Sequence, residues 1–290
     1  MRRFSGVRLA AVGSVLACVL ALVTSLPASA TSEGSFNSNK YLALGDSVTF
    51  GYNPLLLAEP GVNPSSFVGY PQLATDLFRP TLKVFNASCP GETSTSLITG
   101  QKPDNGCQAF RAAIGLHVSY QGSQLKYAKK FVVTNPRTKF VSLMIGANDL
   151  FLLQDYCTTK FPKTINGCII AGLPNLLSTL GKNLNTIYSS LRAAGYKGDF
   201  VAMTYYSTDY RDTVVTGAVA SIDGVLARVT KAYRGEVADG FGRFYLAAAR
   251  FRGDTCAAGL LVRLPSGSCD VHPSPVGAAL LASALYDAAR

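Results

Sequence analysis

A serine stands at the end of an apolar stretch in the segment KYLALGDSVTFGY, residues 40–52. The run Tyr41–Leu44 is typical of a buried strand, and Gly45-Asp46-Ser47 ends it in a tight turn. In open parallel sheets, ligand sites lie beyond the carboxyl ends of the strands, where a rigidly held hydroxyl is well placed to be a nucleophile. The same tripeptide would also suit a strand-to-helix turn without any chemistry, so the rest of the chain must decide.

Three other segments carry residues suited to acyl transfer. They are Asn86–Thr93, Gly146–Asp149 and Asp270–Pro273. A serine hydroxyl needs a base to remove its proton, and the chain has two histidines, His117 and His272. We predict that His272 is the base, because no motif surrounds His117.

A tetrahedral oxyanion needs preorganised hydrogen-bond donors. The backbone N–H of Gly91, the side-chain amide of Asn148 and the backbone N–H of Ser47 could supply three of them. Glycine suits this role because it has no side chain to block a close approach to the backbone. Asp46 and Asp149 are expected to bond nearby backbone N–H groups and to serve the structure.

Strands and helices alternate along the chain, which predicts a parallel sheet covered on both faces. The expected strands are Tyr41–Leu44, Lys83–Ala87, Phe140–Ile145, Phe200–Tyr205 and Arg243–Ala248. Apolar residues at helical spacing predict helices over residues 173–191 and 219–237, and a last helix over Pro275–Ala289. With the strand order 2-1-3-4-5, Ser47, Gly91 and Asn148 would meet at one edge of the sheet.

The connections Thr95–Gln121 and Leu150–Ala171 are long and contain cysteine, glycine and proline. We expect both loops to line a site and to be stapled by disulfides. Tyrosines 52, 205 and 206 lie at or beyond the ends of predicted strands and would either line that site or pack in the core.

Taken together, Gly45-Asp46-Ser47, Gly91, Gly146-x-Asn148-Asp149 and His272-Pro273 resemble the four sequence blocks of the SGNH (GDSL-type) hydrolases. The chain is most similar to secreted actinobacterial esterases and lipases, over nearly its whole length after residue 30. The resemblance implies an α/β fold with three α/β/α layers around a five-stranded parallel sheet. It also implies serine esterase chemistry without metal or cofactor.

By motif position, the resemblance implies that Ser47 is the nucleophile, that Gly91 and Asn148 are oxyanion donors and that His272 is the base. One position departs from the family pattern. The family places an aspartate three residues before the histidine, where this chain has Cys269. Either Asp270 or a backbone carbonyl therefore orients the ring of His272.

The first thirty residues have a basic start, an apolar run and the end Ala28-Ser29-Ala30, which is the pattern of a secretory signal peptide. Its removal would lower the net charge from +10 to +7 and leave one domain over residues 31–290. Six of the seven cysteines lie after residue 30, and an even number of cysteines in an exported chain indicates disulfides. We expect the local pairs Cys89–Cys107, Cys157–Cys168 and Cys256–Cys269.

The sequence thus predicts a secreted, extracellular, monomeric serine esterase or lipase without a metal site. Its substrate would be a small-molecule or lipid ester, with transient contact to a lipid surface. Deacetylation of a polysaccharide and phospholipid hydrolysis are the alternatives on the same fold, and a non-catalytic binding module is the remote one. The chain lacks a dense Lys/Arg block, which disfavours nucleic-acid binding.

Overall fold

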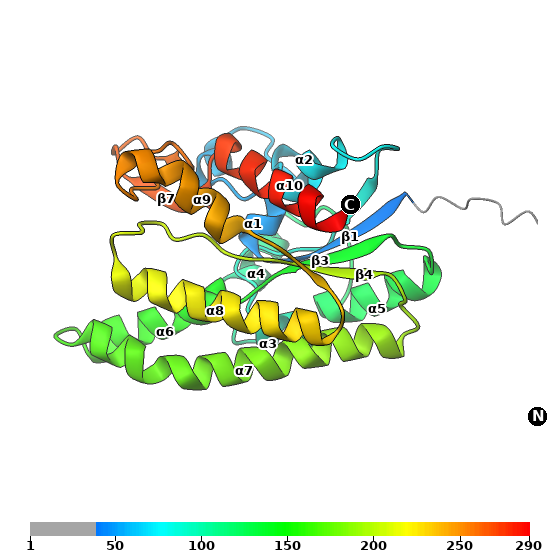
Figure 1. Cartoon of the computed structure of the whole chain (residues 1–290), viewed down its shortest axis with the longest axis horizontal. Helices are drawn as coiled ribbons and strands as arrows, with labels where there is room; N and C mark the ends of the chain where they lie inside the picture. The colour runs from blue at the N-terminus through cyan, green and yellow to red at the C-terminus, as the bar shows by residue number, and fades with distance from the viewer. Residues whose placement is uncertain (1–38) are drawn as a thin grey trace, which may run out of the picture. The chain divides into compact units, whose positions relative to one another are not determined.

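Five parallel strands form the central sheet in the computed structural model, which describes residues 39–290 (Figure 1). They are β1 (Lys40–Gly45), β2 (Lys83–Asn86), β3 (Phe140–Met144), β4 (Asp199–Met203) and β5 (Glu236–Ala238). Their order, β2-β1-β3-β4-β5, confirms the predicted topology. All of β3 is buried, as expected for an apolar strand covered on both faces. The expected signal peptide at residues 1–30 lies outside the described residues.

Helices cover both faces of the sheet (Figure 1). On one face lie α1 (Ser47–Phe50), α2 (Tyr70–Thr75), α9 (Gly240–Ala248) and α10 (Pro275–Ala289). On the other lie α3 (Ser94–Thr99), α5 (Gln124–Thr134), α6 (Ala147–Lys160), α7 (Ile165–Ala193) and α8 (Thr213–Ala232). The connections hold α4 (Cys107–Ala113), the 3-10 turns η1 (Pro54–Ala58), η2 (Pro64–Ser66) and η3 (Ala249–Phe251), and the antiparallel pair β6 (Leu261–Arg263) and β7 (Cys269–Pro273).

The fifth strand was misplaced in the sequence-based prediction. Residues 243–248 belong to helix α9, and the strand is the three-residue β5 just before it. Asp239 separates the two elements, because its side chain accepts a hydrogen bond from the backbone N–H of Gly242 at 2.7 Å and caps the helix. The predicted helix over residues 219–237 consequently ends earlier, at Ala232.

Helix α8 is the one helix in the described part of the chain that is long and apolar enough to cross a bilayer. Its face with Ile222, Leu226 and Val229 is buried, and the helix packs against α7 and the sheet. The length and composition of α8 therefore reflect its place as a core helix.

Of the two connections expected to be loops, residues 150–171 are largely helical, because α6 continues to Lys160 and α7 begins at Ile165. Residues 95–121 contain most of α3 and all of α4 but are otherwise irregular, as expected. The expectation of a loop over residues 150–171 is therefore wrong. The α6–α7 hairpin is closed by the disulfide Cys157–Cys168.

Candidate active site

Ser47 begins helix α1, and only Asp46 separates it from the end of strand β1. The side chain of Asp46 caps this helix by accepting a hydrogen bond from the N–H of Val48 at 3.0 Å. Gly45 has a φ of +150°, and a Cβ atom at this position would lie 2.5 Å from the carbonyl oxygen of Met144 in β3. Only glycine therefore allows the chain to turn here while it stays paired with β3.

His272 lies on β7, and its Nε2 atom is 2.8 Å from the hydroxyl oxygen of Ser47. Its other ring nitrogen, Nδ1, contacts Oδ1 of Asp270, which also accepts a hydrogen bond from the backbone N–H of His272 at 3.0 Å. Burial by itself would raise the pKa of Asp270, but hydrogen bonds and the charge interaction with His272 lower it overall. Of the two orienting groups left open by the sequence, the structure brings the Asp270 carboxylate to the ring.

Strand β7 is anchored on several sides. It pairs with β6, and the disulfide Cys256–Cys269 holds its first residue. The hydroxyl of Tyr206 donates a hydrogen bond to the carbonyl of Val271 at 2.7 Å. The ring of Tyr52 packs 4.7 Å from the imidazole of His272. These contacts restrict where the imidazole can lie.

Two backbone N–H groups at the end of the sheet are candidates for oxyanion donors. The N–H groups of Ser47 and Gly91 donate no hydrogen bond to any residue between 39 and 290. Gly91 has a φ of +83°, and a Cβ atom there would lie 2.3 Å from the carbonyl oxygen of Asn105. Because both N–H groups are unpaired, they are available to a ligand oxygen.

Asn148 lies at the start of α6, after β3, and its amide is already oriented by neighbours. Its Oδ1 atom accepts a hydrogen bond from Nδ2 of Asn105 at 2.9 Å, and its Nδ2 atom donates to the carbonyl of Glu92 at 3.0 Å. The remaining contact of Nδ2, to Oδ2 of Asp46, is 3.5 Å long and therefore weak. The second proton of this planar amide therefore has only a weak acceptor and remains available to a developing oxyanion.

The two aspartates beside the motif residues have structural partners. Asp46 is fully buried, and the hydroxyl of Tyr205 donates to its Oδ2 atom at 2.5 Å. Burial raises the pKa of Asp46 to about 6, although the hydrogen bonds of Tyr205 and Val48 oppose the increase. Asp149 accepts hydrogen bonds from the backbone N–H and the hydroxyl of Ser94, at 2.9 and 2.6 Å.

His117, the other histidine, lies apart from this cluster. Its Nε2 atom is 2.9 Å from the carbonyl oxygen of Phe50, and its ring packs 4.3 Å from the Phe50 ring. Burial lowers the pKa of this imidazole. The ring is therefore half-buried and packs within the loop between α4 and α5.

All six cysteines of the described chain form disulfides, in the three local pairs expected from the sequence. One group of potential metal ligands, Cys89, Glu92 and Cys107, occurs within residues 39–290. Both sulfur atoms of this group belong to a disulfide, so neither is a thiolate that could bind a metal.

Two pockets meet at Ser47 and His272. The first, of about 220 Å³, lies between α6 and α8. Its walls are mostly apolar and include Leu150, Phe151, Val215, Val219 and Ile222, with Tyr205 and Tyr206 at one side. The second, of about 440 Å³, is more open and is lined by Tyr52, Gly91, Asn105 and Phe110. An ester carbonyl at Ser47 would thus have an apolar pocket on one side and an open, mixed pocket on the other.

Several supporting residues carried no signal in the sequence. Gln124, Asn105 and Glu92 hold the segments around the site through contacts between residues far apart in the chain. Polar residues in loops and at helix starts are common, so nothing in the local pattern distinguishes these three. Tyr205 and Tyr206 were expected as lining or packing residues, and they do both.

A family model described as the GDSL-like lipase/acylhydrolase family matches residues 43–280. Among solved structures, an acetylxylan esterase from Geobacillus stearothermophilus is 17% identical, with a TM-score of 0.52 over 87% of this chain and 94% of that one. A lipase from a goat rumen metagenome is 15% identical, with a TM-score of 0.53 over 86% and 96%. At these identities the two structures share the fold with this chain. A comparison with curated protein sequences gave no match.

Proposed function

This chain belongs to the GDSL-like lipase/acylhydrolase family and is a carboxylic-ester hydrolase, and from that premise we propose that it acts through an acyl-enzyme on Ser47 with His272 as general base. The observation that carries the proposal is the 2.8 Å contact between the Ser47 hydroxyl and Nε2 of His272, with Asp270 on the far side of the ring. A hydroxyl at this distance can pass its proton to a neutral imidazole.

In the proposed reaction, the oxygen of Ser47 attacks the ester carbonyl carbon while its proton moves to Nε2 of His272. The negative oxygen is held by the N–H groups of Ser47 and Gly91 and by the amide of Asn148. The carbon–oxygen bond to the alcohol then breaks, and the alcohol leaves with the proton from His272. Water then attacks the carbonyl carbon of the acyl-enzyme and gives a proton to His272. The bond to Ser47 breaks, the acid is released, and His272 returns the proton to the Ser47 oxygen.

Asp270 has a defined part in this scheme. Its carboxylate accepts the Nδ1–H of His272, which leaves Nε2 free to receive the proton of the serine. The same carboxylate stabilises the imidazolium that forms during both halves of the reaction. The lowered pKa of Asp270 supports this role, because it keeps the group ionised over the range in which an imidazole can act as a base.

We propose an acyl group of several carbons as the preferred substrate. The pocket between α6 and α8 has a volume of about 220 Å³ and mostly apolar walls, far more space than an acetyl group needs. Each methylene buried there would contribute about 0.8 kcal/mol. The acetylxylan esterase among the structural neighbours makes acetyl-sugar deacetylation the second candidate, for which the open pocket beside Tyr52 and Phe110 offers aromatic faces to a sugar.

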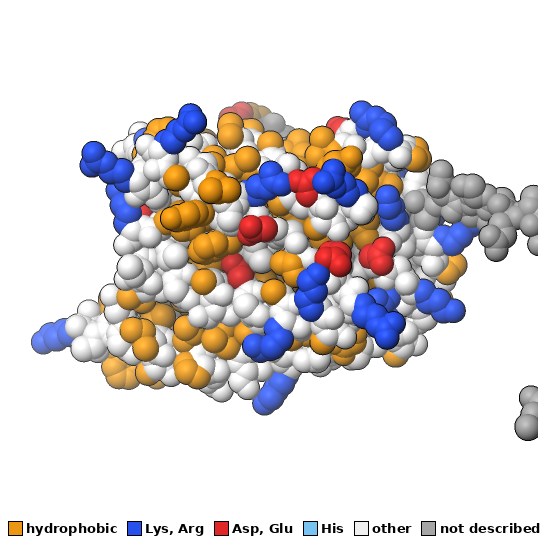
Figure 2. Space-filling model, in the orientation of Figure 1, with side chains coloured by type: hydrophobic (Ala, Val, Ile, Leu, Met, Phe, Trp, Pro, Cys, Tyr) orange, Lys and Arg blue, Asp and Glu red, His pale blue; other side chains and the backbone are white. Residues whose placement is uncertain are grey.

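We further propose that the enzyme is secreted and makes transient contact with lipid surfaces. Three disulfides fit an oxidising compartment. The α6–α7 hairpin exposes Tyr156, Phe161 and Ile170, and Figure 2 shows hydrophobic side chains over this end of the molecule. Lys160 and Lys163 are exposed on the same hairpin, so an anionic lipid surface would complement it.

The proposal is tested by the hydrolysis of p-nitrophenyl butyrate by the purified protein and by Ser47→Ala. Ser189→Ala is the matched control, because Ser189 is exposed on α7 and its hydroxyl bonds only the helix backbone. We expect Ser47→Ala to lose activity by at least roughly 1,000-fold and the control to retain it. Equal rates for wild type and Ser47→Ala would end the assignment of the nucleophile.

A further inference from the structure

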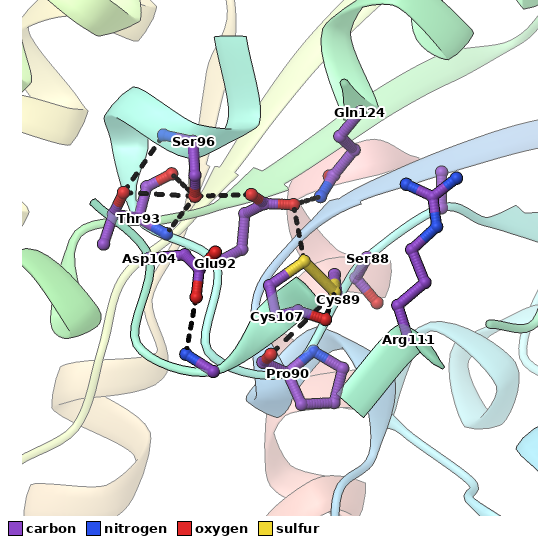
Figure 3. The surroundings of a disulfide bond; sticks show 12 residues. Ser88, Cys89, Pro90, Glu92, Thr93, Ser96, Asp104, Cys107, Arg111 and Gln124 are labelled. Atoms are coloured by element: carbon purple, nitrogen blue, oxygen red, sulfur yellow. Dashed lines mark hydrogen bonds between the residues drawn. A yellow bond between two sulfur atoms is a disulfide. The ribbon is translucent and has the colours of Figure 1, made fainter. Parts of the chain in front are cut away.

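Glu92, which directly follows Gly91, is a buried carboxyl group that the proposed reaction does not use. Only 3% of its surface is exposed, and its side chain points into the protein beside the disulfide Cys89–Cys107 (Figure 3). Burying a carboxyl group is costly unless it has hydrogen-bond partners. The contacts of Glu92 therefore indicate what the group does there.

Two helices and a disulfide-closed loop meet at the Glu92 carboxyl group. From α3, the hydroxyl of Ser96 donates a hydrogen bond to Oε1 at 2.5 Å. From the start of α5, Nε2 of Gln124 donates to Oε2 at 3.1 Å (Figure 3). A sulfur atom of Cys107 lies 3.6 Å from the same Oε2 atom. The carboxyl group is thus the point at which α3, α5 and the stapled loop are joined.

Gln124 extends this connection to the strand that carries the nucleophile. Its Oε1 atom accepts a hydrogen bond from the N–H of Gly45 at 2.6 Å, and its Nε2 atom donates to the carbonyl of Gly45 at 3.0 Å. Gly45 ends β1, two residues before Ser47. One amide side chain therefore ties the end of β1 to the residue after Gly91.

The backbone of Glu92 makes the third connection. Its carbonyl oxygen accepts the hydrogen bond from Nδ2 of Asn148 at 3.0 Å. Since Glu92 is bonded to Gly91, linked through Gln124 to the strand before Ser47 and hydrogen-bonded to Asn148, it contacts the supports of all three candidate oxyanion donors. No other residue described above joins these three segments.

We propose that Glu92, with Gln124, is a positioning residue that sets the spacing of the oxyanion donors around Ser47. The inference rests on the proposed function of Ser47 and goes beyond it. Misplacing these donors would weaken hydrogen bonds that form fully only in the transition state, so the effect should fall on kcat and leave KM nearly unchanged. If Glu92 only stabilised the fold, its substitution would instead lower the melting temperature and leave the kcat of the folded enzyme unchanged.

The charged state of Glu92 offers a second, independent readout. Burial raises the pKa of its carboxyl group to about 7, and the hydrogen bonds from Ser96 and Gln124 oppose the increase. Of the nearby charges, that of Asp104 raises this pKa further and that of Arg111 lowers it. Tyr120 also faces the group, and its own pKa is raised, first by burial and then by Glu92. An ionised Glu92 beside the oxyanion loop would disfavour a second negative charge.

Two substitutions separate these effects. Glu92→Gln keeps the shape, because a glutamine can accept from Gln124 through its oxygen and donate to Ser96 through its nitrogen. Glu92→Leu removes the bridge altogether. The matched control is Tyr188→Phe, which removes an equally buried hydrogen bond, to Thr230 at 2.8 Å, between α7 and α8.

The experiment measures kcat, KM and melting temperature with p-nitrophenyl butyrate. We expect Glu92→Leu to lower kcat by roughly 10- to 100-fold with little change in KM. Glu92→Gln should keep most of the wild-type kcat at about pH 6. Tyr188→Phe should leave kcat unchanged. The ratio of wild-type kcat to that of Glu92→Gln should fall as the pH rises from about 6 to about 8.

The proposal would be overturned by a Glu92→Leu enzyme that keeps the wild-type kcat. If that variant does not fold, Gln124→Leu decides, because it removes the other half of the same bridge, and a wild-type kcat in that variant would overturn the proposal. Either outcome differs from a failure of the proposed function, in which the wild type and Ser47→Ala would hydrolyse the ester equally.

Discussion

The apolar pocket between α6 and α8 can be narrowed by a single substitution. Val219 lies on α8, is half-buried and lines this pocket with Leu150 and Phe151. Val219→Phe would place an aromatic ring in a cavity of about 220 Å³. Because the ring fills part of the cavity, it should shorten the acyl chain that the enzyme can accept. It should leave the polar end of the pocket at Ser47 unchanged.

The size of the effect follows from the burial of methylene groups. At about 0.8 kcal/mol each, every methylene that enters the pocket should raise kcat/KM by roughly fourfold. A butyrate ester, with two more methylenes than an acetate ester, should therefore be preferred by roughly 15-fold in the wild type. Val219→Phe should reduce or abolish this preference and change the kcat/KM for acetate by no more than about twofold.

The assay is a series of p-nitrophenyl esters from acetate to octanoate, measured below the solubility limit of each ester. Val133→Phe is the control, because Val133 lies exposed on α5 and lines neither pocket at Ser47. An identical chain-length profile for wild type and Val219→Phe would refute the assignment of this pocket to the acyl chain. A wild type that prefers acetate would favour the acetyl-sugar alternative.

Three further predictions concern other parts of the molecule. Asp270→Ala should lower kcat by roughly 100- to 10,000-fold in steady-state assays, because His272 would lose its orienting carboxylate, and a near-wild-type rate would mean that a backbone carbonyl suffices. Glu92→Gln should remove a pH dependence of stability. In the folded protein the Glu92 carboxyl group keeps its proton up to about pH 7, whereas in the unfolded chain it loses the proton near pH 4.5. The free energy of unfolding of the wild type should therefore fall by about 3 kcal/mol as the pH rises through this window, from about 4.5 to about 7. Urea unfolding at both ends of the window measures this, and parallel curves for wild type and variant would contradict it. Replacing Tyr156, Phe161 and Ile170 by serine should weaken sedimentation with anionic phospholipid vesicles, while butyrate hydrolysis in solution continues; unchanged sedimentation would argue against the hairpin as the lipid contact.

The strands nearest the site could be predicted because their signal is local. Runs such as Tyr41–Leu44 and Phe140–Ile145 are short and almost entirely apolar, which is typical of strands buried on both faces. Once the order of these strands is given, Ser47, Gly91 and Asn148 must follow three neighbouring carboxyl ends.

The fifth strand could not be placed in the same way. The run from Arg243 to Ala248 is apolar over too few residues to separate a strand from a helix, while β5 itself has only three residues. Asp239, four residues before Arg243, was the available sign of a helix start. The α6–α7 hairpin was missed because the glycine and proline in this segment suggested a loop. The segment instead forms the ends of two helices, which the disulfide Cys157–Cys168 holds together.

The support of the site lies beyond any local pattern. Gln124 meets Gly45 across 79 residues of chain, and Tyr205 meets Asp46 across 159. Such contacts depend on how the layers pack, so they become visible only when the fold is known. The motif residues could therefore be found from the sequence, whereas the residues that hold them in place could not.

The central claim, that His272 activates Ser47, is tested most directly by the rate at which a fluorophosphonate labels the serine. Peptide mass mapping should find the adduct on Ser47 in the wild type, and the labelling rate should fall by at least roughly 100-fold in His272→Ala. An adduct on another residue, or equal labelling of Ser47 in both proteins, would contradict the account.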